Sequence, residues 1–199
     1  VLYLSDNSIN DMKKKLHLLL FAILFAVTSL RSQAQLYINE YSCSNVSQYA
    51  DTYAKHEDWI EIYNGGSSAV NLTGFYLSDD STNLTKWKIR QNISIAAGGF
   101  SAFWASGRDT GNHTNFKFTQ TKTKTEQIVL SDTDGSQIDL VIIIKTQLGH
   151  SIGRSTNGGS TWGIFIAPSK GASNNASTQY TAYAETPTIS LTAGFYGNA

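Results

Sequence analysis

Two groups of carboxylates in this chain of 199 residues could bind a cation. The motif Asp132-Thr133-Asp134-Gly135 alternates carboxylates before a glycine, and carboxylates in this arrangement can wrap a calcium ion. The other ligands of an EF-hand loop are missing, so a hairpin turn is the favoured interpretation. Asp79-Asp80 would need Asp109 from a distant loop to complete a site. The sequence therefore predicts no metal and no cofactor, with weak calcium binding at either place as the alternative.

Hydrolytic chemistry would need paired acids or an activated nucleophile. Asp58 and Glu61 lie three residues apart on a predicted strand, so their side chains point to opposite faces and cannot share a substrate there. Ser151 follows His150 directly, and neighbouring strand residues also face apart. No Gly-x-Ser-x-Gly motif surrounds this serine. We therefore predict no catalytic residues and a protein that is not an enzyme.

Aromatic side chains offer binding in place of bond breaking. The predicted strand at residues 57–63 directs alternate side chains to opposite faces. One face carries Ile60 and Ile62, which we assign to the core. The other face carries Trp59, Glu61 and Tyr63. Exposed rings stack on sugars or anchor protein partners, so these three residues form the predicted binding patch, unless loops or a following domain cover them.

The elements that position these residues are short strands. Alternation of apolar and polar residues predicts strands at residues 36–41, 57–63, 70–72, 75–78, 87–90, 100–105, 115–118, 127–130, 138–143 and 162–166. Turn motifs such as Asn64-Gly65-Gly66 separate them, which is typical of an all-β sandwich. We assign Trp87 and Trp104 to its core. The apolar run at residues 140–144 does not alternate, and we expect it to be covered on both faces.

Charge and cysteine content limit the partners and the means of stabilisation. Lys and Arg together number 15, as do Asp and Glu, so no net basic field attracts nucleic acid. The partner is then a protein or a glycan, of unknown identity. Cys43 is the single cysteine, which excludes an internal disulfide and predicts a half-buried thiol.

The N-terminal region has the pattern of a helical signal peptide at residues 12–34. Met12-Lys13-Lys14-Lys15 is a basic start, and the apolar stretch at residues 16–30 follows it. Ser32-Gln33-Ala34 suits signal peptidase, so cleavage is expected before Gln35. A membrane anchor is the alternative, but the apolar run is shorter than the roughly 20 residues that span a bilayer. We predict a secreted, cell-surface or periplasmic protein that meets the membrane only through this peptide, with residues 1–11 as an unstructured upstream extension.

The remaining sequence divides into a domain at residues 35–175 and a tail at residues 176–199. Several phrases of the domain occur in a fixed order: Leu36-Tyr37-Ile38-Asn39-Glu40-Tyr41, Asp58-Trp59-Ile60-Glu61-Ile62-Tyr63-Asn64, Asn71-Leu72-Thr73-Gly74-Phe75-Tyr76-Leu77-Ser78, Phe103-Trp104-Ala105-Ser106-Gly107 and Glu126-Gln127-Ile128-Val129-Leu130-Ser131-Asp132. In this order they resemble the bacterial branch of the lamin tail domain. The resemblance implies an immunoglobulin-like β-sandwich over residues 35–175.

The tail resembles a different family. After a small polar linker, residues 187–197 are similar to the opening strand of the β-sandwich domain that ends chitobiase-type hexosaminidases. The two resemblances imply a non-catalytic interaction or spacer module of a larger secreted or cell-surface multidomain protein. The alternative is an accessory carbohydrate-binding module of an exported enzyme.

Overall fold

The computed structural model describes residues 12–17, 35–119 and 125–185. The chain divides into two units, Val1–Ala34 and Gln35–Ala199. In the first unit, residues 12–17 are helical, while the rest of the predicted signal peptide and the upstream extension lie outside the described residues. The predicted start of a second β domain, residues 186–199, lies outside them as well. Within the described ranges, no helix has the length and apolar character that crossing a membrane requires.

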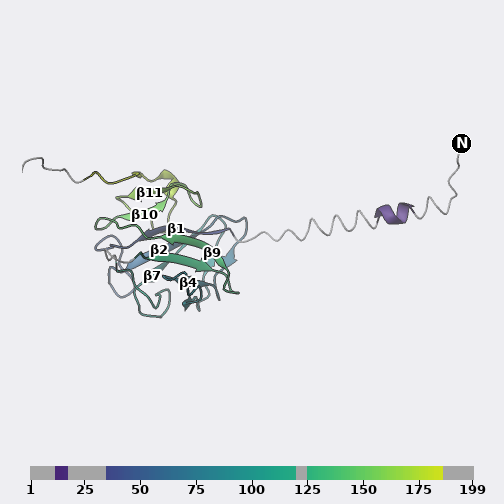
Figure 1. The fold of residues 1–199 in the computed structure, drawn as a ribbon, viewed down its shortest axis with the longest axis horizontal. Helices are drawn as coiled ribbons and strands as arrows, with labels where there is room; N and C mark the ends of the chain where they lie inside the picture. Colours follow the sequence, from purple (N-terminus) through teal and green to yellow (C-terminus); the bar gives the residue numbers. More distant parts are fainter. Residues whose placement is uncertain (1–11, 18–34, 120–124, 186–199) are drawn as a thin grey trace, which may run out of the picture. The chain divides into compact units, whose positions relative to one another are not determined.

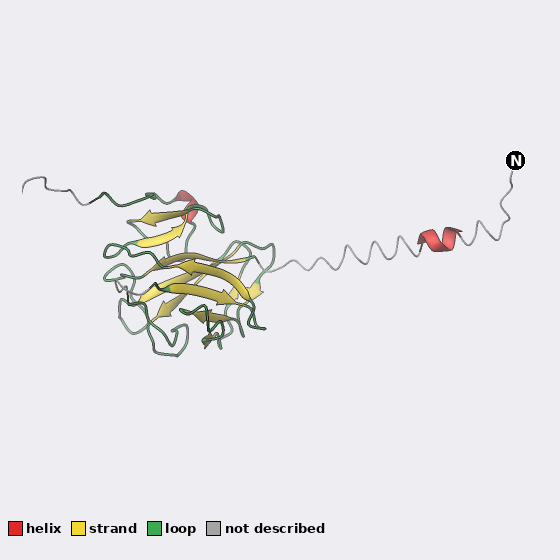
Figure 2. Ribbon diagram, in the orientation of Figure 1, coloured by secondary structure: helices red, strands yellow, loops and turns green. Residues whose placement is uncertain are grey.

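The second unit is built from antiparallel sheets (Figures 1 and 2). The first sheet has the order β11-β10-β1-β2-β7 and contains β1 (Leu36–Ser42), β2 (Asp58–Asn64), β7 (Phe100–Ala105), β10 (Ser151–Arg154) and β11 (Trp162–Phe165). The second sheet has the order β5-β4-β8-β9 and contains β4 (Tyr76–Ser78), β5 (Trp87–Lys88), β8 (Gln127–Ser131) and β9 (Gln137–Ile142). A short pair joins β3 (Val70–Asn71) to β6 (Ser94–Ile95), and one 3₁₀ turn, η1, covers Asn174–Ala176.

The core lies between the two larger sheets and follows the alternation in the sequence. Ile60 and Ile62 of β2 are fully buried there, as predicted, together with Ile128 and Leu130 of β8. Trp87 also belongs to this cluster, which confirms its assignment. This packing confirms the predicted all-β, immunoglobulin-like sandwich.

A β-bulge in β1 changes which of its side chains face the core. The register with β2 shifts between Ile38 and Glu40, so Asn39 is the extra residue. Ile38 pairs with Ile62 before the shift, and Tyr41 pairs with Ile60 after it. Because a shift of one residue exchanges the two faces, Glu40 points away from the core.

The apolar run at residues 140–144 is less covered than predicted. Val141 is buried, but Ile142 is 48% exposed and Ile144 is 60% exposed. The prediction was wrong because β9 is an edge strand of its sheet, so only part of the run meets the sandwich interior. Cys43 departs from prediction in the other direction, since it is buried and not half-buried.

The described part of the tail lies against β11. Tyr180 and Ile164 exchange two main-chain hydrogen bonds, of 2.8 and 2.9 Å between nitrogen and oxygen. Tyr183 stacks on His150, with ring centroids 5.7 Å apart. The segment therefore extends the first sheet beyond its last strand.

Candidate functional site

The predicted patch of Trp59, Glu61 and Tyr63 lies on the outer face of the first sheet, but it is not an open surface. Trp59 and Glu61 have no exposed area, and only Tyr63 is partly exposed. Residues 167–176, here called the covering segment, bind to this face, and Tyr49 packs its ring edge-to-face on Trp59 at 5.9 Å. Trp59 and Glu61 are therefore covered by other parts of the chain, which is the alternative to an exposed patch that the sequence left open.

Trp104 is buried on the same outer face, not in the sandwich core. It pairs across β2 and β7 with Trp59, and it is 5% exposed. The prediction that Trp104 is buried was right, but the prediction that it lies in the sandwich core was wrong. The two indoles, one on each strand, form a continuous aromatic floor beneath the covering segment.

Glu40 and Glu61 form a buried acidic pair under the same segment. They are cross-strand partners, and neither has any exposed area. Glu40 accepts hydrogen bonds from the Ser151 hydroxyl (2.5 Å) and from the backbone N–H (2.9 Å) and hydroxyl (2.6 Å) of Ser169. Glu61 accepts from the Gly171 backbone N–H and from the Asn39 side-chain amide (3.4 Å). The covering segment thus provides donors to both carboxyls.

Burial of this pair changes its protonation. Loss of solvent, together with the neighbouring Glu40, raises the pKa of Glu61 to about 8. Burial also raises the pKa of Glu40. The hydrogen bonds from Ser151 and Ser169 lower this pKa, but by less than burial raises it. The pair can therefore retain a proton near neutral pH. The covering segment shields both carboxyls from solvent. In this conformation the two carboxyls therefore serve as hydrogen-bond acceptors that hold the segment in place.

Asn174 anchors the covering segment, and Gly153 makes room for it. The Asn174 side-chain amide is fully buried and donates to the backbone oxygens of Arg154 (2.9 Å) and Asn39 (3.3 Å). A Cβ on Gly153 would lie 2.7 Å from Asn174 Nδ2 and 2.9 Å from the Phe165 ring. Only glycine permits this close approach of the segment to β10.

A second polar cluster, which sequence reasoning missed, contains Ser106, His113 and Asp51. The Ser106 hydroxyl lies 2.9 Å from His113 Nδ1, and Asp51 Oδ2 lies 3.9 Å from the same nitrogen. A catalytic triad needs the serine and the carboxylate on opposite ring nitrogens, so this arrangement is not one. Arg108 joins the cluster by ion pairs to Asp51 (2.6 Å) and Glu57 (2.9 Å). Ser106, Arg108 and His113 share the loop after β7, but Asp51 and Glu57 come from the loop before β2, so no local spacing could reveal the whole cluster.

The carboxylates considered for calcium have other partners. Asp134 Oδ1 accepts from the backbone N–H (2.8 Å) and hydroxyl (2.6 Å) of Ser136 in the β8–β9 hairpin, which confirms the predicted turn. Asp79 pairs with Lys86 at 2.5 Å, and Asp109 pairs with Arg90 at 2.8 Å. In the part of the chain that the structure describes, no three His, Cys, Asp or Glu residues are grouped to hold a metal.

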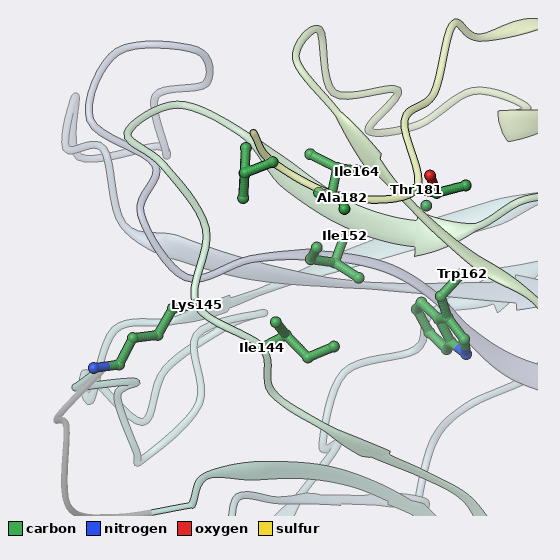
Figure 3. A pocket seen from close by; sticks show the side chains of 9 residues that line it. Ile144, Lys145, Ile152, Trp162, Ile164, Thr181 and Ala182 are labelled. Atoms are coloured by element: carbon green, nitrogen blue, oxygen red, sulfur yellow. The ribbon is translucent and has the colours of Figure 1, made fainter. Parts of the chain in front are cut away.

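An apolar groove lies where β10 and β11 meet the end of β9 and the tail. Its volume is about 280 Å³. It is lined by Ile144, Lys145, Ile152, Trp162, Gly163, Ile164, Thr181, Ala182 and Tyr183. Figure 3 shows Ile152 between Ile144 and Ile164, with Trp162 at one end and the Lys145 ammonium directed away from them. A second hollow of about 240 Å³ shares Ile144, Ile152 and Trp162, and it extends the groove along β9.

Comparison with known proteins agrees with this architecture. The family model of the Lamin Tail Domain matches residues 30–145, which is more than half of the chain. The chain belongs to the lamin tail domain family. No curated protein matches it, and no solved structure matches it.

The match to the lamin tail domain ends before much of the candidate site begins. It spans β1 to β9, whereas β10, β11 and the covering segment follow residue 145. Glu40, Glu61 and the indoles thus lie on the matched part of the domain, while the covering segment lies outside it. Lamin tail domains are immunoglobulin-like and typically non-catalytic modules.

Proposed function

We propose that this lamin tail domain is a non-catalytic interaction and spacer module of a larger exported protein, with the apolar groove as its contact site. The observation that carries this proposal is the exposure of Ile142 and Ile144 beside the groove. Large aliphatic side chains at a sheet edge favour association with another extended chain. Main-chain pairing of Tyr180 with Ile164 is an example of such addition within the chain itself.

The occupant that we assign to the groove is the segment that follows Glu185. Residues 186–199 contain no Asp, Glu, Lys or Arg, and Ile189 and Leu191 alternate with polar residues. The described lining of the groove is also mostly apolar, with Lys145 as its one charged residue. Ile189 follows Tyr183 in the groove wall by six positions, and six extended residues reach about 20 Å. The resemblance to a chitobiase-type domain suggests that this segment opens a second β domain, so the groove would hold the junction between the two.

A double-mutant cycle on the free energy of unfolding tests this assignment. Ile144→Ala and Leu191→Ala should show a coupling of at least about 0.5 kcal/mol if the two side chains touch. The matched control pairs Leu191→Ala with Leu148→Ala, because Leu148 is 73% exposed and does not line the groove. Equal coupling in both cycles, or no coupling in either, would reject the groove as the site for this segment.

Export is the second part of the proposal. It is supported by the basic start at residues 12–15, the apolar stretch at residues 16–30 and the Ser32-Gln33-Ala34 motif. Mass spectrometry of the chain recovered outside an expressing bacterium should find Gln35 as its first residue. Recovery of the whole chain inside the cell, with its first 34 residues intact, would contradict export.

Carbohydrate binding is a second candidate, and a row of partly exposed rings favours it. Tyr37 and Tyr63 stack with centroids 6.4 Å apart, and Tyr63 and Phe100 lie 5.1 Å apart. Such a row on a sheet surface can stack on sugar rings. A glycan array should then show binding that Tyr63→Ala removes and that Tyr53→Ala, a change at an exposed tyrosine elsewhere, leaves intact. An array without binding would reject this candidate.

A further inference from the structure

The side chain of Lys170 rests on two aromatic rings of the covered face. Its ammonium nitrogen lies 4.7 Å from the centroid of the Trp104 ring and 4.9 Å from that of Tyr49. Within residues 35–119 and 125–185, no carboxylate oxygen lies within 4.0 Å of this nitrogen. The contact is therefore with ring faces, whose negative charge density attracts cations.

Trp59 completes the surroundings of this position. Trp59 supplies the floor, since Tyr49 packs on it edge-to-face and Trp104 is its cross-strand partner. Its Nε1 is buried and has no hydrogen-bond partner within the described residues. Several aromatic ring faces around one cation are the composition of cages that recognise quaternary ammonium groups.

Lys170 can leave this position without loss of the anchors of the covering segment. Ser169 is bonded to Glu40, and Asn174 is bonded to Arg154 and Asn39, so both ends are held independently of the lysine side chain. The residues after Lys170, Gly171 to Ser173, are exposed. Rotation of the flexible lysine stem is then enough to free the rings.

We propose that the rings of Tyr49 and Trp104 form an ammonium-binding site, filled in the closed state by the chain's own Lys170, and that the ammonium group of a ligand replaces it when Lys170 turns outward. This site is separate from the apolar groove and goes beyond the proposed interaction through it. Its ligand class is a primary or methylated ammonium, which either a lysine of a partner protein or a choline headgroup carries.

Calorimetric titration of the wild-type chain and of Lys170→Ala tests the proposal. The probes are trimethyllysine amide, lysine amide and choline, with 3,3-dimethylbutanol as the uncharged analogue of choline. Removal of the internal competitor should tighten binding of at least one ammonium probe about tenfold or more, while the uncharged analogue should not bind. Preference for the lysine amides would identify a protein lysine as the source, and preference for choline would identify a headgroup.

A second variant separates the ammonium site from a general effect on the surface. Tyr49→Leu in the Lys170→Ala background should abolish the binding, because it removes one ring face. Equal affinity of the wild-type chain and Lys170→Ala, binding of the uncharged analogue, or no effect of Tyr49→Leu would each overturn the proposal. Lys170→Gln, which keeps the stem without the charge, replaces Lys170→Ala if the latter does not fold. The test of the groove uses substitutions at Ile144 and Leu191, which do not belong to the ammonium site. Failure of the groove assignment would therefore leave these titration results unchanged.

Discussion

Glu40 and Glu61 are direct cross-strand partners on the outer face of the first sheet, and both are fully buried. The bulge at Asn39 creates this relationship, because it turns Glu40 away from the core and toward Glu61. Two neighbouring carboxyls without solvent cannot both ionise at low cost. The pair therefore makes the attachment of the covering segment sensitive to pH.

The first prediction concerns the pH dependence of stability. The folded-state pKa of Glu61, about 8, lies above its ordinary value of 4.5, so the native state binds the proton more tightly than the unfolded state. The resulting stabilisation is fully present below pH 4.5 and is lost as the pH rises through about 8. Urea unfolding should show a loss on the order of 4 kcal/mol as the pH rises from 4.5 to 8, since each pKa unit corresponds to about 1.36 kcal/mol.

Glu61→Gln is the variant that tests this origin. It should reduce the slope of the pH profile between pH 4.5 and 8, since the amide cannot ionise. Burial also raises the pKa of Glu40 and raises that of Asp58 to about 7, so these two groups keep the rest of the slope. Glu185→Gln, at an exposed carboxylate, should leave the wild-type slope intact. A slope in Glu61→Gln equal to that of the wild type would assign the pH dependence to other groups.

The second prediction is that Gly153→Ala loosens the covering segment. The added methyl would lie 2.7 Å from Asn174 Nδ2, so the domain should lose about 1 to 3 kcal/mol of unfolding free energy. Trypsin should also cleave after Lys170 faster than in the wild type. In the double variant with Asn174→Ala, the loss should be smaller than the sum of the single losses, because the clash is relieved. Additive losses would show that Asn174 is not what the methyl meets.

The third prediction concerns the ion pair of Asp139 and Arg154, which links β9 to the first sheet. Asp139 Oδ2 accepts from Arg154 (2.8 Å) and from the backbone N–H of Ile38 (2.8 Å). Asp139→Asn leaves a largely buried guanidinium without its counter-charge and should cost about 3 kcal/mol. Arg90→Gln breaks an exposed ion pair and should cost less than about 1 kcal/mol. Similar costs for the two variants, measured by urea unfolding, would contradict the structural role of Asp139.

The fourth prediction concerns the reactivity of Cys43. Burial raises the pKa of this thiol to about 11, so little thiolate exists at pH 8. A disulfide reagent such as DTNB should modify the native chain only at the rate of unfolding, and the chain in urea within seconds to minutes. Rapid modification of the folded chain at pH 8 would mean that the thiol is accessible.

Sequence alternation predicted the core of β2 because each side chain there obeys a local period of two. The position of Glu40 was beyond such reasoning, since no residue near Asn39 marks a bulge and one extra residue exchanges the faces. The covering segment has the small polar residues of a linker, and its role depends on distant partners such as Arg154 and Glu40. The exposure of Ile144 depends on the order of strands in a sheet, which local patterns do not encode.

The pairing of Tyr180 with Ile164 also bears on how this module would carry mechanical load. A pull on the polypeptide beyond Glu185 reaches these two hydrogen bonds before it reaches any strand of the sandwich. The tail can then separate from β11 and lengthen the extended part of the chain while the core stays folded.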